Sequence, residues 1–177
     1  MALDPRPEPR KRKERLDWPS LGWVCRDPGR LIMFGFGSGL LRPGPGTWGT
    51  LLAWGLWVLA APSSPDWAVG LFLLAAYAYG CWAAQRVGRE LGVSDHSGMV
   101  WDEMVAFWLV LWLTPGTLMG QACAFALFRL FDIAKPAPIR QFDRRLKNGF
   151  GAMFDDLLAA LFTLLTLAIA VRLGAPL

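Results

Sequence analysis

The sequence has little charge and few of the residue types on which many soluble enzymes depend. Asp, Glu, Lys and Arg make up 18% of its 177 residues, and there is one histidine. Its three cysteines show no paired spacing, so they predict neither a disulfide nor a metal site. A P-loop motif and a nucleophile-elbow motif are both absent, which argues against a P-loop nucleotide site and an elbow-type serine hydrolase.

Hydrophobic residues, by contrast, make up 54% of the chain, and ten residues are tryptophan. Several apolar runs approach the ~20 residues that a membrane-spanning helix needs. A soluble helical protein with a large core is the alternative. The low charge and the long runs favour a small integral membrane protein.

The N-terminal tail, residues 1–28, carries the basic run "RKRKER" at 10–15. No apolar stretch long enough for a signal peptide follows it directly. We expect this tail to be disordered and residues 29–177 to form the membrane domain. A basic run of this kind can bind nucleic acid, but beside membrane spans it favours contact with anionic lipid headgroups on the cytoplasmic side, so no nucleic-acid partner is predicted.

The membrane domain is predicted to be an all-α, polytopic helical bundle. Apolar helices are expected at residues 47–61, 67–84, 99–113, 117–133 and 154–173. Residues 31–50 are rich in Gly and Pro, which break helices, so they predict an irregular or re-entrant segment. Such backbone is tolerated at membrane depth only where protein or water covers it.

Basic residues lie in the loops on the same side as the tail. The opposite loops carry no Lys or Arg until Arg172. The positive-inside rule therefore predicts that the tail and the charged loops face the cytoplasm.

Carboxylates gather on this same predicted face. Oxygen ligands of this kind suit a hard divalent cation such as Mg²⁺. Arg129 stands three residues before Asp132, on one helix face, and Lys135 follows. Acids that hold a metal, next to cations that neutralise phosphoryl oxygens, are typical of phosphate chemistry. The candidate acids are Asp95, Asp102, Glu103, Asp132, Asp155 and Asp156.

Each of these residues also has a simpler explanation. The adjacent acid pairs are expected near the starts of helices, where the dipole favours negative charge. Arg129 and Asp132 can form a structural ion pair. His96 lies in a polar loop and can be a surface residue. The functional interpretation depends on all these charges meeting on one membrane face.

Three segments, in this order, resemble the phosphatidylglycerophosphatase A family. They read "GFGSGLLRPGPGTWGTL" at 35–51, "SDHSGMVWDEMVAFW" at 94–108 and "FRLFDIAKPAPIRQFDRRLKNGFGAMFDDLLA" at 128–159. The resemblance implies a multi-pass protein of the bacterial inner membrane. It also implies Mg²⁺-dependent hydrolysis of phosphatidylglycerophosphate to phosphatidylglycerol and inorganic phosphate, with the active face cytoplasmic.

The resemblance also implies roles for the matching residues. Arg129 and Lys135 are implied phosphate contacts, and Asp95 and His96 are implied proton carriers. The implied metal-site acids are Asp102, Glu103, Asp132, Asp155 and Asp156. Two alternatives remain open at this point: a phosphatase for another lipid phosphate, and a small membrane transporter or scaffold. The sequence does not indicate an oligomeric state.

Overall fold

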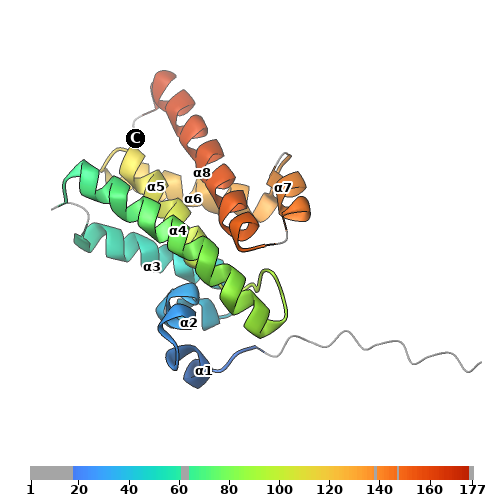
Figure 1. Cartoon of the computed structure of the whole chain (residues 1–177). Helices are drawn as coiled ribbons and strands as arrows, with labels where there is room; N and C mark the ends of the chain where they lie inside the picture. Colours follow the sequence, from blue (N-terminus) through green and yellow to red (C-terminus); the bar gives the residue numbers. More distant parts are fainter. Residues whose placement is uncertain (1–17, 61–63, 138, 147, 176–177) are drawn as a thin grey trace, which may run out of the picture.

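The computed structural model describes residues 18–60, 64–137, 139–146 and 148–175, in which helices joined by loops are the regular structure and no strand occurs (Figure 1). The all-α prediction is confirmed. The elements are α1 (Leu21–Cys25), α2 (Pro28–Met33), η1 (Gly35–Leu40), α3 (Pro45–Ala60), α4 (Asp66–Leu91), α5 (Trp101–Leu113), α6 (Leu118–Ala134), α7 (Ile139–Arg145) and α8 (Gly149–Arg172).

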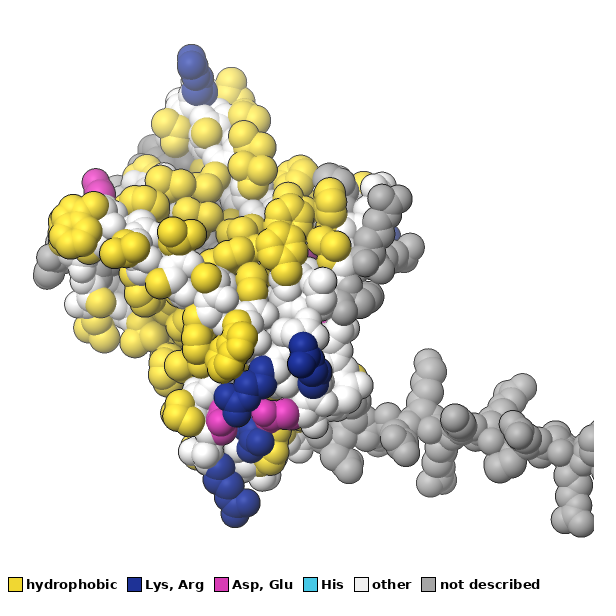
Figure 2. Space-filling view, viewed as in Figure 1, with side chains coloured by type: hydrophobic (Ala, Val, Ile, Leu, Met, Phe, Trp, Pro, Cys, Tyr) yellow, Lys and Arg dark blue, Asp and Glu magenta, His cyan; other side chains and the backbone are white. Residues whose placement is uncertain are grey.

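The five predicted apolar helices correspond to α3, α4, α5, α6 and α8. Among the described residues, α4 and α8 are long and apolar enough to cross a membrane, with 26 and 24 residues and mean hydropathies of 1.5 and 2.0. They expose large side chains such as Trp67, Leu74 and Leu165. Figure 2 shows hydrophobic side chains over most of the visible face and a group of Lys, Arg, Asp and Glu side chains near the bottom, while one basic side chain lies at the top and one acidic side chain at the upper left. The chain is an all-α membrane protein.

Helix α5 lies at the centre and packs against α3, α4, α6 and α8. Nine of its 13 residues are buried. A buried indole needs a partner for its N–H. Trp108 Nε1 donates to the carbonyl of Ala53 on α3 at 2.8 Å, and Trp101 Nε1 donates to that of Ala76 on α4 at 3.1 Å. These bonds fix the position of α5, and so of the acids in its first turn.

The Gly/Pro-rich segment is irregular, as predicted. Residues 31–44 comprise the end of α2, η1 and a loop, and Gly35, Phe36 and Gly37 have positive φ angles of 52°, 56° and 97°. Residues 45–50, which were expected to belong to this segment, form the start of α3 instead. A Cβ on Gly39 would lie 2.0 Å from the carbonyl oxygen of Gly98. Only glycine at position 39 allows this segment to pack directly on the loop that leads into α5.

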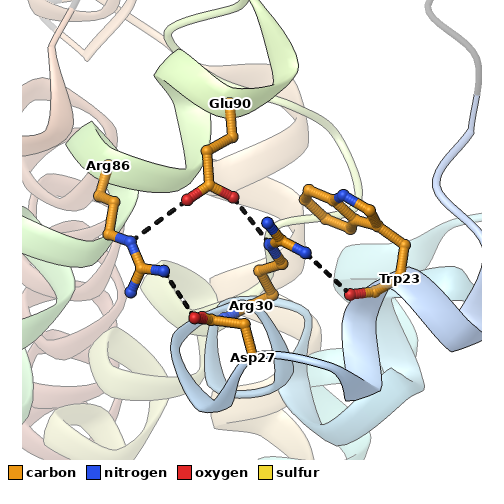
Figure 3. Close-up of polar contacts among 5 residues, drawn as sticks. All are labelled: Trp23, Asp27, Arg30, Arg86 and Glu90. Atoms are coloured by element: carbon orange, nitrogen blue, oxygen red, sulfur yellow. Dashed lines mark hydrogen bonds and ion pairs between the residues drawn. The ribbon is translucent and has the colours of Figure 1, made fainter.

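Residues 18–28, which were predicted to belong to a disordered tail, have a defined structure. Residues 18–28 contain α1, with Ser20 as its N-cap, and the start of α2, which Asp27 caps by accepting from Arg30 N at 3.0 Å. Asp27 also accepts from Arg86 Nη2 on α4 at 2.6 Å (Figure 3). This long-range ion pair has no signature in the sequence, which is why the boundary was wrong. The rest of the tail, with "RKRKER", lies outside the described residues.

Candidate active site

A pocket of about 220 Å³ lies where the start of α3, the loop before α5 and the ends of three helices meet. Its acids and cations come from α5, α6, α8 and that loop. The lining residues are Gly44, Pro45, Gly46, Asp95, Ser97, Met99, Asp102, Glu103, Arg129, Asp132, Lys135, Asp155 and Asp156. Eight of the nine site residues predicted from the sequence therefore meet in one cavity.

Three carboxylates form the acidic centre of this pocket. Asp102, Glu103 and Asp156 each offer an oxygen, and these oxygens lie within 4.8 Å of one another. Asp102 and Asp156 are buried. Glu103 Oε2 is also buried and has no hydrogen-bond partner in the described part of the chain. A buried carboxylate oxygen without a donor costs free energy, so it indicates a place for a cation.

The other two predicted metal ligands are held differently. Arg129 Nη1 donates to Asp132 Oδ2 at 2.5 Å and lies 3.7 Å from Glu103 Oε1. The amine of Lys135 donates to Asp155. Asp132 and Asp155 therefore orient the two cations beside the acidic centre.

Lys135 reaches the pocket because it ends α6 in a left-handed conformation, with φ 39° and ψ 63°. Its amide donates to the Phe131 carbonyl at 2.9 Å, which closes the helix. Glycine or asparagine usually occupies such a position. The backbone of a lysine in this conformation is strained. The same residue contacts Asp155 on α8 through its side chain.

Gly46 provides the space in which the acidic centre meets Arg129. A Cβ at this position would lie 2.1 Å from Glu103 Oε1 and 2.9 Å from Arg129 Nη2. The sequence shows several glycines in this region and predicts no special role for Gly46. A glycine in the first turn of an otherwise apolar helix was the available signal.

His96 is the predicted site residue that does not line the pocket. It is buried, with its ring centroid 4.8 Å from that of Trp18 and 5.8 Å from that of Phe34, and its Nδ1 accepts from Gly98 N at 3.0 Å. Burial lowers the pKa of His96. The neighbouring Asp95 does line the pocket, and it is exposed. His96 therefore packs against aromatic rings outside the pocket, whereas Asp95 lies at the exposed rim of the pocket.

Residues 31–171 match the family model described as phosphatidylglycerophosphatase A. The chain belongs to the phosphatidylglycerophosphatase A family.

Three relatives illustrate the range of this similarity. A phosphatidylglycerophosphatase A of Haemophilus influenzae is 44% identical over 141 residues, which cover 78% of this chain and 86% of the relative. That of Escherichia coli is 36% identical, with coverages of 77% and 80%. A protein of Bacteroides thetaiotaomicron named as a candidate phosphatidylinositol-3-phosphatase is 37% identical, with coverages of 79% and 91%. No solved structure matches the chain significantly. Membership of the phosphatidylglycerophosphatase A family makes this protein a phosphatase.

Proposed function

We propose that this phosphatase hydrolyses phosphatidylglycerophosphate to phosphatidylglycerol and inorganic phosphate in phospholipid synthesis, with Mg²⁺ as cofactor. One observation carries the proposal: acids and cations from several elements converge in one pocket of a membrane protein. The two relatives named phosphatidylglycerophosphatase A support the choice of substrate.

The charge of the pocket supports a cation requirement. Six carboxyl side chains and only two cationic ones line it. A phosphate monoester carries up to two negative charges near neutral pH. It would be repelled unless a bound cation or protons offset the acids. The oxygen-only ligand set fits Mg²⁺, which keeps several waters and needs few carboxylates.

Asp102, Glu103 and Asp156 are the proposed ligands, because their oxygens lie within 4.8 Å of one another. Mg²⁺ held there would supply positive charge to the phosphoryl oxygens and increase the acidity of a nearby water. Asp132 and Asp155 hold Arg129 and Lys135 instead. We therefore reduce the predicted set of five metal ligands to three.

The side chains of the pocket suggest the order of events. Arg129 and Lys135 bind the terminal phosphoryl group and neutralise its oxygens. A water attacks phosphorus, the bond to the glycerol oxygen breaks, and that oxygen takes a proton. Asp95, at the exposed rim, accepts the proton from water and returns it to the leaving glycerol oxygen. Attack by an aspartate, with a covalent intermediate that water then cleaves, is the alternative course.

The basic loops and the "RKRKER" run support a multi-pass arrangement in the bacterial inner membrane with the pocket at the cytoplasmic interface. The lipid's acyl chains would remain in the bilayer while its headgroup enters the pocket. A second substrate, phosphatidylinositol 3-phosphate, is suggested by the name of the Bacteroides relative.

Phosphate release from purified protein distinguishes these substrates. Phosphatidylglycerophosphate, phosphatidylinositol 3-phosphate and phosphatidic acid are compared at equal surface concentration, with Mg²⁺ or with EDTA. We expect the highest kcat/KM for phosphatidylglycerophosphate, abolition by EDTA, and recovery with Mg²⁺. A preference for another lipid phosphate would refute the substrate assignment. Full activity in EDTA would refute the metal.

A further inference from the structure

A second hollow, of about 590 Å³, lies between α4 and the start of α8 and shares no residue with the catalytic pocket. Most of its lining comes from one face of α4. Six residues of that helix contribute: Ala78, Cys81, Trp82, Gln85, Arg86 and Arg89. Their spacing of three or four residues places them along a single stripe. The hollow is therefore a groove parallel to the helix axis.

The stripe changes from apolar to cationic along its length. It begins with Ala78 and Trp82 and ends with Arg86 and Arg89. The eleven helical steps from Ala78 to Arg89 rise about 16 Å, close to the thickness of one leaflet, which is half of the ~30 Å hydrocarbon core. The groove therefore has the length and polarity of one lipid molecule lying along α4. The exposed indole of Trp82 lies between the two halves, as interfacial tryptophans do.

The cationic end has a surplus of positive charge. In Figure 3, Arg86 contacts Asp27 and Glu90, at 2.6 and 3.2 Å, and Arg30 contacts Glu90 at 2.7 Å. The charges of these two arginines and two carboxylates therefore balance, with Glu90 contacting both arginines, and Arg89 adds a further positive charge. Arg89 lies one turn beyond Gln85, is exposed, and makes no ion pair with any residue whose position the structure describes. Its guanidinium is available to an anion.

Two amides complete the polar end. Gln85 accepts a hydrogen bond from Gly149 N at 2.9 Å through its carbonyl oxygen, so its NH₂ group can donate. Asn148 accepts from Gly151 N at 2.8 Å in the same way. Phe150, from the first turn of α8, adds apolar surface opposite α4.

We propose that this groove binds an anionic glycerophospholipid of the bilayer. Its phosphodiester contacts Arg89 and the two amides, and an acyl chain lies against Trp82 and Phe150. An anionic lipid fits better than a zwitterionic one, because a cationic headgroup would be repelled by the arginines. Since the start of α8 forms one wall of this groove and α8 also carries Asp156, a bound lipid would hold the catalytic helix in place. The proposal does not depend on the substrate of the phosphatase.

Native mass spectrometry of the full chain, released from detergent micelles, tests this site. Dioleoyl phosphatidylglycerol and dioleoyl phosphatidylcholine are titrated against wild type and Arg89→Gln. We expect wild type to prefer phosphatidylglycerol, and Arg89→Gln to bind it about tenfold more weakly, since one charge-assisted contact is lost. Lipid in the catalytic pocket is common to both proteins, so the difference reports on Arg89.

Arg172→Gln is the matched control, because it removes an exposed arginine at the far end of α8. It should bind phosphatidylglycerol as wild type does. Ala78→Phe, which fills the apolar half of the groove, should weaken binding without changing charge. Equal binding by Arg89→Gln and wild type would overturn the proposal. So would equal retention of the two lipids by wild type, or an equal loss in Arg172→Gln.

Discussion

Replacing Asp156 by Asn should make the metal-free protein more stable while abolishing its activity. Asp156 shares a buried site with Asp102 and Glu103, whose ligand oxygens lie within 4.8 Å of one another. Two unit charges at that distance repel by about 3.5 kcal/mol when the effective dielectric constant is about 20. Asparagine keeps the shape and removes the charge, so it removes this repulsion from the folded state.

The gain in the free energy of unfolding should lie below that value, because carboxyls in such a cluster also reduce their repulsion by binding protons. A gain of about 1–3 kcal/mol remains a measurable change in Tm. Mg²⁺ should raise the Tm of wild type, since it binds the folded state. It should raise that of Asp156→Asn much less, because one proposed ligand has lost its charge.

The assay is thermal unfolding in detergent with EDTA or Mg²⁺, combined with phosphate release. Asp66→Asn serves as the control, because Asp66 is an exposed acid at the start of α4 whose Oδ1 accepts from Trp112 Nε1, a bond that asparagine keeps. It should change neither the Mg²⁺ response nor the activity. The reasoning fails if Asp156→Asn is less stable than wild type in EDTA, or if Mg²⁺ stabilises both proteins equally.

Two further predictions concern residues around and beyond this cluster. Gly46→Ala should lower kcat/KM by about 100-fold, because the new methyl group would displace Glu103. This is about the loss expected when one contact to the transition state is removed. A loss of less than about threefold in a phosphate-release assay would contradict the geometry. The hydrogen bond from Arg86 holds the pKa of Asp27 below its usual range. The ionised carboxylate therefore stabilises the folded state above about pH 4, and this stability is lost as the pH falls through the lowered pKa. Thermal unfolding from pH 6 to pH 3 should show a smaller drop in Tm for Asp27→Asn than for wild type, and an identical drop would refute the link.

The sequence predicted the helices well where apolar runs define them and poorly where charges continue a helix. The expected end of α4 at residue 84 was wrong, because the helix continues through Arg86 and Glu90 until Gly92 adopts a left-handed conformation with φ 72°. Helix α7 lies in a basic segment that was expected to be a loop. The cap at Gly92 and ion pairs to α2 set the end of α4, and α7 packs against α8, so contacts with other elements rather than hydrophobic periodicity determine the backbone here.

In the site, too, the sequence predicted some features and only the structure shows the others. Residue types and their order predicted which acids and cations lie close together in one pocket, because carboxylates beside an apolar run are costly unless something offsets their charge. Their division into an acidic centre and two ion pairs required the structure. Only the fold shows that Asp132 and Asp155 hold Arg129 and Lys135, while His96 packs against aromatic rings outside the pocket.

Helix position separates the two explanations for the acid pairs. Asp102 and Glu103 lie in the first turn of α5, so the helix dipole favours their charge, whatever else they do. Asp155 and Asp156 were expected at the start of a helix beginning at residue 154, but α8 begins at Gly149 and has no acid in its first turn. The dipole effect falls off within one turn and does not stabilise this second pair. Lys135 offsets the charge of Asp155, whereas Asp156 lies within 4.8 Å of two other carboxylates. A buried charge in such surroundings requires a compensating cation or a proton, and this requirement makes Asp156 the most informative position for testing the metal.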